Sequence, residues 1–99
     1  MKIKGDGIKF SVAAVRHNDE TNDAAVIMGS DGMLAVIELA DGSSSKDLKI
    51  NDIIAFDWEP YGPGVAMNNT TGKDVNVIVN ATGLTPEQVR AHGFPQYPL

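Results

Sequence analysis

Short apolar runs rich in β-branched residues, separated by Gly, Asn and Asp, recur along this chain of 99 residues. In the segment 8–12, Ile, Phe and Val alternate with Lys and Ser, which is the period of a half-buried β-strand. Val15 falls on the opposite parity to Val12. The sequence therefore predicts a strand over residues 8–15 with a β-bulge near Ala13-Ala14.

Five further strands follow from the same reasoning. They are predicted at 24–29, 33–39, 52–58, 64–69 and 73–81. Ser30-Asp31-Gly32 separates the first two, and Asn69-Thr70-Thr71-Gly72 separates the last two. Each of these polar segments predicts a hairpin, because Gly supplies the positive φ that a tight turn requires. The polar stretch 40–51, with its consecutive serines, predicts a long flexible connection.

One helix is predicted near the C-terminus. Thr85 is a good N-cap, Pro86 suits the first helical position, and Gln88 completes a capping box. The helix is expected over about 86–92. The tail 93–99 contains two prolines and cannot continue the helix, so its aromatic residues are expected to fold back over an apolar opening.

Six short strands and one short helix predict a single all-β domain over residues 1–99, a small six-stranded antiparallel barrel or barrel-like sheet of general OB or SH3 character. The segment "DLKINDIIAFD" at 47–57 resembles a pattern found in many small barrels, where Leu-Lys-x-Gly-Asp precedes a buried strand. Asn51 stands where Gly is usual, and Asn tolerates the left-handed conformation. The resemblance implies architecture and no particular activity.

The composition of the chain excludes several kinds of chemistry. The chain has no cysteine, so it can form neither disulfides nor thiolate metal sites, and it has no cysteine nucleophile. No apolar run approaches the roughly 20 residues of a membrane helix, and the first ten residues lack the apolar region of a signal peptide. A cytoplasmic location is the expectation.

Charge is unevenly distributed. The net charge of −5 disfavours non-specific attraction to nucleic acid or anionic membranes. Residues 1–17 carry four basic side chains against one acidic, a net of +3, and the remaining residues carry four against twelve, a net of −8. The basic group consists of Lys2, Lys4, Lys9 and Arg16.

Few residues of the sequence are suited to catalysis. Only His17 and His92 could act as bases near neutral pH, and the sequence contains no nucleophile elbow and no phosphate-binding loop. No enzyme activity and no cofactor are therefore predicted. A hard metal ion could be held by the acidic turn after the first strand, which contains His17, Asp19, Glu20 and Asp23, but the spacing matches no metal-loop motif and the question stays open.

The stretch "FDWEPYGPG" at 56–64 contains the only tryptophan. Trp58 shares the parity of Ile54, which places it in or at the rim of the core, and the prolines and glycines that follow end the strand. Tyr61 belongs to the loop itself. An exposed tyrosine in a proline-stiffened loop loses little entropy on binding, so Tyr61 is a candidate contact residue.

These observations predict a non-catalytic β-barrel module that acts through protein–protein contacts, self-association included. The alternative is an OB-like binder of single-stranded nucleic acid or another anionic ligand, which requires a basic groove with stacking aromatics. The candidate interaction residues are Tyr61, Trp58, Lys2, Lys4, Lys9 and Arg16.

Overall fold

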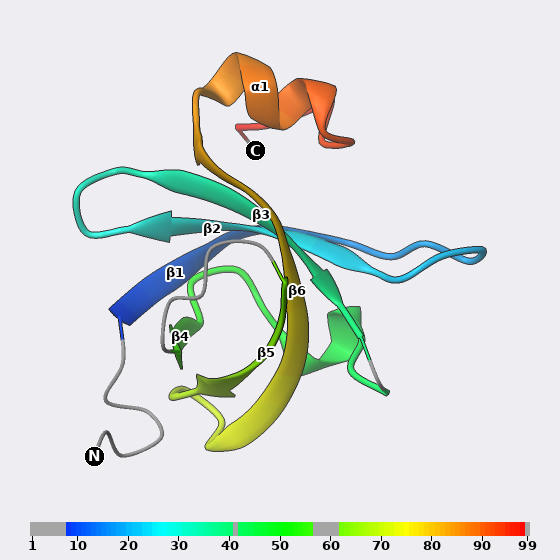
Figure 1. The fold of residues 1–99 in the computed structure, drawn as a ribbon, viewed down its shortest axis with the longest axis vertical. Coiled ribbons are helices and arrows are strands. Elements are labelled where there is room, and N and C mark those ends of the chain that lie inside the picture. Colours follow the sequence, from blue (N-terminus) through cyan, green and yellow to red (C-terminus); the bar gives the residue numbers. More distant parts are fainter. Residues whose placement is uncertain (1–7, 41, 57–61, 99) are drawn as a thin grey trace.

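The computed structural model describes residues 8–40, 42–56 and 62–98 (Figure 1). Its elements, in chain order, are β1 (Ile8–Arg16), β2 (Ala24–Gly29), β3 (Leu34–Leu39), the 3₁₀ turn η1 (Ser45–Asp47), β4 (Ile53–Phe56), β5 (Gly62–Asn68), β6 (Lys73–Leu84) and α1 (Pro86–Ala91). The strands form a closed antiparallel barrel in the order β1-β2-β3-β6-β5-β4. The predicted all-β barrel with one short C-terminal helix is confirmed.

Two long-range pairings close the barrel. Strands β1 to β3 form a meander, and β4 returns beside β1, which is the Greek-key arrangement. The twelve-residue strand β6 then pairs with both β5 and β3. Closure leaves few unpaired strand edges, so an open edge is not a reason for self-association in the described part of this sheet.

The bulge predicted in β1 is present. Val12 lies opposite Ile27 while Ala14 lies opposite Val26, which leaves Ala13 as the extra residue. The bulge reverses the inward parity of the strand. Val12 therefore packs inside the barrel, whereas Ala14 packs against the opposite face of the sheet.

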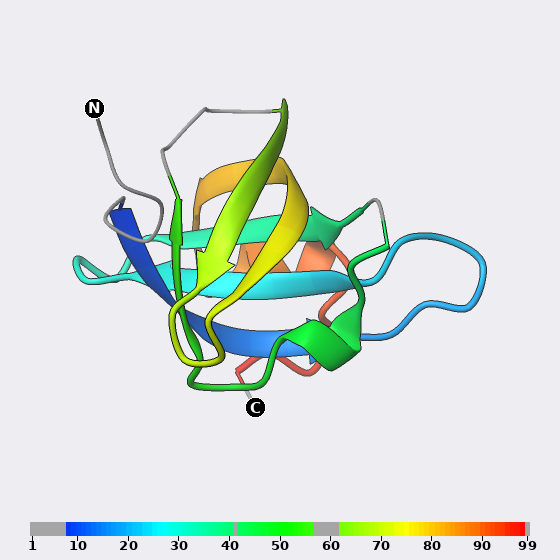
Figure 2. The same cartoon turned by 90° about the horizontal axis from the view of Figure 1, so that it is seen from below.

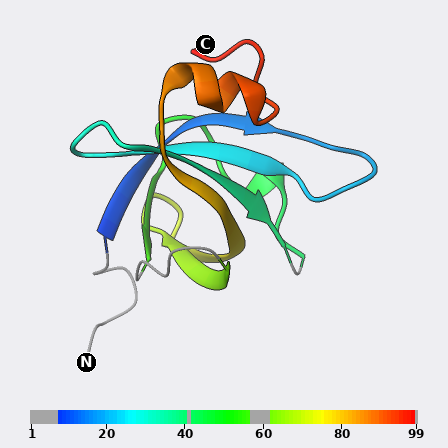
Figure 3. The same ribbon diagram turned by 45° about the horizontal axis from the view of Figure 1, so that its top comes forward.

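The fold has two hydrophobic clusters, one inside the barrel and one outside it. Ala25 and Ile27 point into the barrel, whereas Ala24 and Val26 point outward. The outward residues are covered by α1 and the tail, which lie across the outer face of β1, β2 and β3 (Figure 3). Burial on both faces explains why the second and third strands read as nearly continuous apolar runs.

The tail differs from its prediction in what it covers. Phe94, only 6% exposed, packs on the outer wall of the sheet, against Val26 and Val36, and not over an opening of the barrel. The helix before it begins as predicted: Gln88 N–H donates to Thr85 Oγ1 at 3.2 Å, and Thr85 N–H donates to Gln88 Oε1 at 2.8 Å. The capping box thus sets the direction in which the helix leaves β6.

The connection between β3 and β4 is not the flexible linker that its serines suggested. Ser44 and Asp47 form a capping box around η1. Leu48 is 2% exposed and belongs to the barrel core. Local hydrogen bonds and one buried apolar anchor therefore hold a segment whose composition alone is typical of a linker.

Asn51 adopts the left-handed conformation that its place in the barrel pattern suggested, with φ of 77°. Asn51→Gly is expected to keep the stability of the protein within a few tenths of a kcal/mol, because Gly adopts this conformation freely. Asn51→Val should lose about 1–2 kcal/mol, since a β-branched residue is strained there. Urea unfolding of both variants tests this, and equal stabilities would contradict it.

Candidate functional site

The described residues include two of the six predicted interaction residues. Lys9 and Arg16 lie at opposite ends of β1. They are seven positions apart, which is about 20 Å along a strand. Their side chains therefore do not form one basic patch. The other four candidates, Lys2, Lys4, Trp58 and Tyr61, fall outside the described residues.

Lys9 lies between two adjoining hollows on the surface. One, of about 260 Å³, is bounded by Ile8, Lys9 and the turn of the β2–β3 hairpin, including Met33. The other, of about 400 Å³, lies on the outer wall between Met28 and Ile53. Phe10, Gly29 and Ser30 line both hollows together with Lys9.

The wall of the larger hollow spans three strands. Ser11 of β1 lies directly opposite Met28 of β2 on one side and Ile53 of β4 on the other. Neighbouring strands are about 4.8 Å apart, so the two apolar side chains lie about 10 Å apart across Ser11. We call Lys9, Ser11, Met28 and Ile53 together the Lys9 surface.

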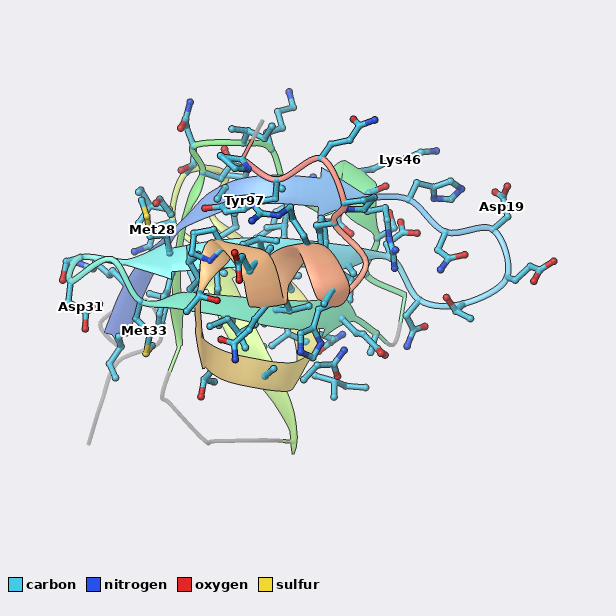
Figure 4. The ribbon with its side chains drawn as sticks, turned by 90° about the horizontal axis from the view of Figure 1, so that it is seen from above. Asp19, Met28, Asp31, Met33, Lys46 and Tyr97 are labelled. Atoms are coloured by element: carbon cyan, nitrogen blue, oxygen red, sulfur yellow. The ribbon has the colours of Figure 1, made fainter. Side chains whose placement is uncertain are left out.

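Two exposed apolar side chains lie on this wall. Met28 is 39% exposed and Ile53 38%, and these are two of the five large apolar side chains exposed among the described residues. Figure 4 shows Met28 with Met33 and Asp31 at the hairpin end of the molecule, away from Asp19 at the other end. An apolar group of this kind around one cation is typical of a contact surface.

Gly29 shapes the floor of the hollows. It lies opposite Phe10, whose ring is 2% exposed. A Cβ atom at Gly29 would lie 3.0 Å from Asp31 Oδ1 and 3.4 Å from Phe10 Cε1. The absence of a side chain at this position therefore lets the Phe10 ring and the hairpin approach closely, and keeps the hollows open.

Arg16 has a different environment. Its Nη1 donates a hydrogen bond to Gly93 O at 2.7 Å, and its guanidinium carbon lies 5.4 Å from the centre of the Phe94 ring. Together with Tyr97 these residues line a pocket of about 170 Å³ beside the tail. Arg16 thus holds the tail on β1, a role that sequence reasoning missed because the partner residues lie more than 75 positions away.

The acidic turn after β1 brings three of its four predicted residues together. His17 Nε2 lies 2.8 Å from Asp19 Oδ1, and His17 Nδ1 lies 2.9 Å from Asp23 Oδ1. Glu20 is exposed, and no ion pair joins it to this group in the described structure. Hydrogen bonds from the ring to Asp23 and then to Asp19 raise the pKa of His17 above its ordinary value.

Asp23 is the buried member of this group, at 6% exposed. Its carboxylate accepts the backbone N–H of Ser45 at 2.7 Å and that of Asn18 at 2.8 Å. These bonds, with the His17 ring, hold the pKa of Asp23 well below its usual range. The aspartate therefore joins the β1–β2 loop to η1.

The arrangement does not resemble a metal centre. The two aspartates occupy opposite nitrogens of the His17 ring, so the three groups do not converge on one point. Within residues 8–40, 42–56 and 62–98, no cluster of three or more His, Cys, Asp or Glu side chains is placed to hold a metal ion.

Comparison with known proteins assigns no family. No protein-family model matches the chain, and neither known proteins nor solved structures gave a significant match. Among the described residues, no helix has the length and apolar character needed to cross a membrane.

Proposed function

We propose that this protein is a non-catalytic β-barrel module that binds another protein through the Lys9 surface. The observation that carries the proposal is the exposure of Met28 and Ile53 on the same outer wall as Lys9, along a hollow of about 400 Å³. Apolar side chains that stay in water in the free protein gain free energy when a partner covers them.

A protein partner fits this surface better than a nucleic acid does. Binding of single strands requires a basic groove, and Lys9 and Arg16 do not share one. The net charge of −5 also opposes attraction to phosphates. A second copy of the chain is one partner to test, on the strength of the apolar side chains alone.

Met28→Lys and Ile53→Lys test the proposal. Each change is expected to weaken partner binding about tenfold, because it removes the exposed part of an apolar side chain and places a charge that the partner would have to desolvate. Stability should fall by about 1 kcal/mol or less, because more than a third of each side chain is exposed and neither belongs to the core. Sedimentation velocity measures self-association, and affinity capture with wild-type and variant bait identifies other partners.

Val65→Lys is the matched control, since Val65 is 48% exposed and lies on β5 beyond β4. A partner retained by the wild type and by Val65→Lys, but lost by Met28→Lys and Ile53→Lys, supports the proposal. A partner that binds all four proteins equally contacts another surface, and a protein that neither self-associates nor captures a partner overturns the proposal.

A further inference from the structure

The His17 ring is held between two carboxylates, one at each nitrogen. Asp19 lies at Nε2 and Asp23 at Nδ1, both within 2.9 Å. A neutral imidazole has one N–H donor, so it can donate to only one of two carboxylates. Both contacts are hydrogen bonds only when the ring is doubly protonated and positively charged.

The two carboxylates differ in their burial and in their other hydrogen bonds. Asp23 is 6% exposed and keeps two backbone N–H donors, from Asn18 and Ser45, whatever the state of the ring. The side chain of Asp19 is 91% exposed. The Asp19 contact is therefore the one that a loss of the His17 proton would release.

Among the residues that the structure describes, few other charged groups lie near the ring. Glu20 lies on the same loop with an exposed side chain, and Lys46 is exposed on η1. The remaining carboxylates on the neighbouring elements have other partners: Asp47 accepts the Ser44 N–H, and Glu38 of β3 accepts the side-chain amides of Asn22 and Asn80. Asp19 and Asp23 are thus the groups that face the ring directly.

We propose that His17, Asp19 and Asp23 form a pH-sensitive clasp, closed when His17 is protonated and open at the Asp19 side when it is neutral. The clasp orders the loop between β1 and β2, which projects from the barrel at the end opposite the β2–β3 hairpin (Figure 2). The inference is independent of the Lys9 surface, since Figure 4 places Asp19 and Met28 at opposite ends of the molecule.

The direction of the pH effect follows from linkage. The folded-state pKa of His17 is raised, so the clasp contributes its full stability below the unfolded value of about 6.5 and loses it as pH rises through the folded value. The pKa of Asp23 is lowered, so its contribution is full above about 3.9 and is lost as pH falls below that. The loop is therefore best ordered between these two limits.

Backbone ¹⁵N relaxation of the wild-type protein at pH 5.5 and pH 9 tests the clasp. The order parameters of the loop amides at 18–21 are expected to be near 0.85 at pH 5.5 and below about 0.6 at pH 9. Order parameters that are the same at both pH values, or a His17 ring that titrates at or below 6.5, would overturn the proposal.

Three variants separate the clasp from a general effect of pH. His17→Gln should show a mobile loop at both pH values, because glutamine cannot donate to two carboxylates on opposite sides. Asp19→Asn, an exposed change that spares the fold, should lower the pKa of His17 relative to the wild type. His92→Gln alters the other histidine and should leave the loop as in the wild type. If His17→Gln keeps the wild-type pH dependence, the clasp is not its cause.

Discussion

Replacement of Asn68 by Leu is expected to lower the free energy of unfolding by about 3 kcal/mol. Asn68 is fully buried, and its amide nitrogen donates to Asp47 O at 3.0 Å and to Asp52 Oδ2 at 2.9 Å. Its carbonyl oxygen accepts the backbone N–H groups of Thr70 and Thr71. Leucine has a similar volume but cannot form these hydrogen bonds. Asp52 is only 7% exposed, so its carboxylate would lose the Asn68 amide with little access to water in its place.

Asn80→Leu is the matched control for this change. Asn80 is exposed and donates to Glu38 at 3.0 Å, so its replacement should cost no more than about 0.5 kcal/mol. Urea unfolding monitored by circular dichroism measures both variants. If Asn68→Leu is as stable as Asn80→Leu, the buried amide contributes no net stability and the expectation is wrong.

Features that depend on neighbouring residues could be read from the sequence. The bulge at Ala13 follows from the parity of Val12 and Val15, and the left-handed Asn51 follows from its place before β4. The capping box of α1 needs only Thr85 and Gln88. In each case the deciding interaction lies within a few positions along the chain, where side-chain type and spacing determine the geometry.

Features that depend on distant pairing could not be read in this way. The role of Arg16 requires Gly93, which is distant in the sequence. Asparagine is common in turns, and the local sequence does not show that Asn68 is buried and donates to Asp52. The continuous apolar run of β2 indicates that both faces of the strand are buried. The sequence did not show that the tail covers the outer face. The sequence showed the His17 clasp only as an acidic turn, since Asp23, which contacts the ring, is itself held by Ser45 of η1, 22 positions further along the chain.

The Lys9 surface likewise combines a residue predicted from the sequence with residues that only the fold brings together. Lys9 was a predicted contact residue because it is basic and near the N-terminus, whereas the structure adds the two apolar side chains on β2 and β4 that flank Ser11, on the same face as Lys9. Met28 and Ile53 each read as ordinary strand residues, and only the closure of β4 onto β1 brings them to the same wall. The candidate surface is therefore a product of the barrel topology.

Phe94→Ala is expected to lower the free energy of unfolding by about 3–4 kcal/mol. The ring is 6% exposed and packs with Val26, Val36 and Val89 on the outer wall of the sheet. Its removal also takes the aromatic face from beneath the Arg16 guanidinium. Thermal or urea unfolding measures the loss, and Gln96→Ala, an exposed change in the same tail, should cost no more than about 0.5 kcal/mol.

The same variant connects the tail to the candidate surface. Val26, beneath the tail, and Met28, in the Lys9 surface, point to the same side of β2, because residues two apart on a strand share a face. Loosening the tail should therefore enlarge the exposed apolar area next to Met28, and Phe94→Ala should self-associate more strongly than the wild type in sedimentation velocity. Adding Met28→Lys should reverse part of that gain. A Phe94→Ala protein that is as stable as the wild type would contradict the assignment of the tail as the second layer over β1, β2 and β3.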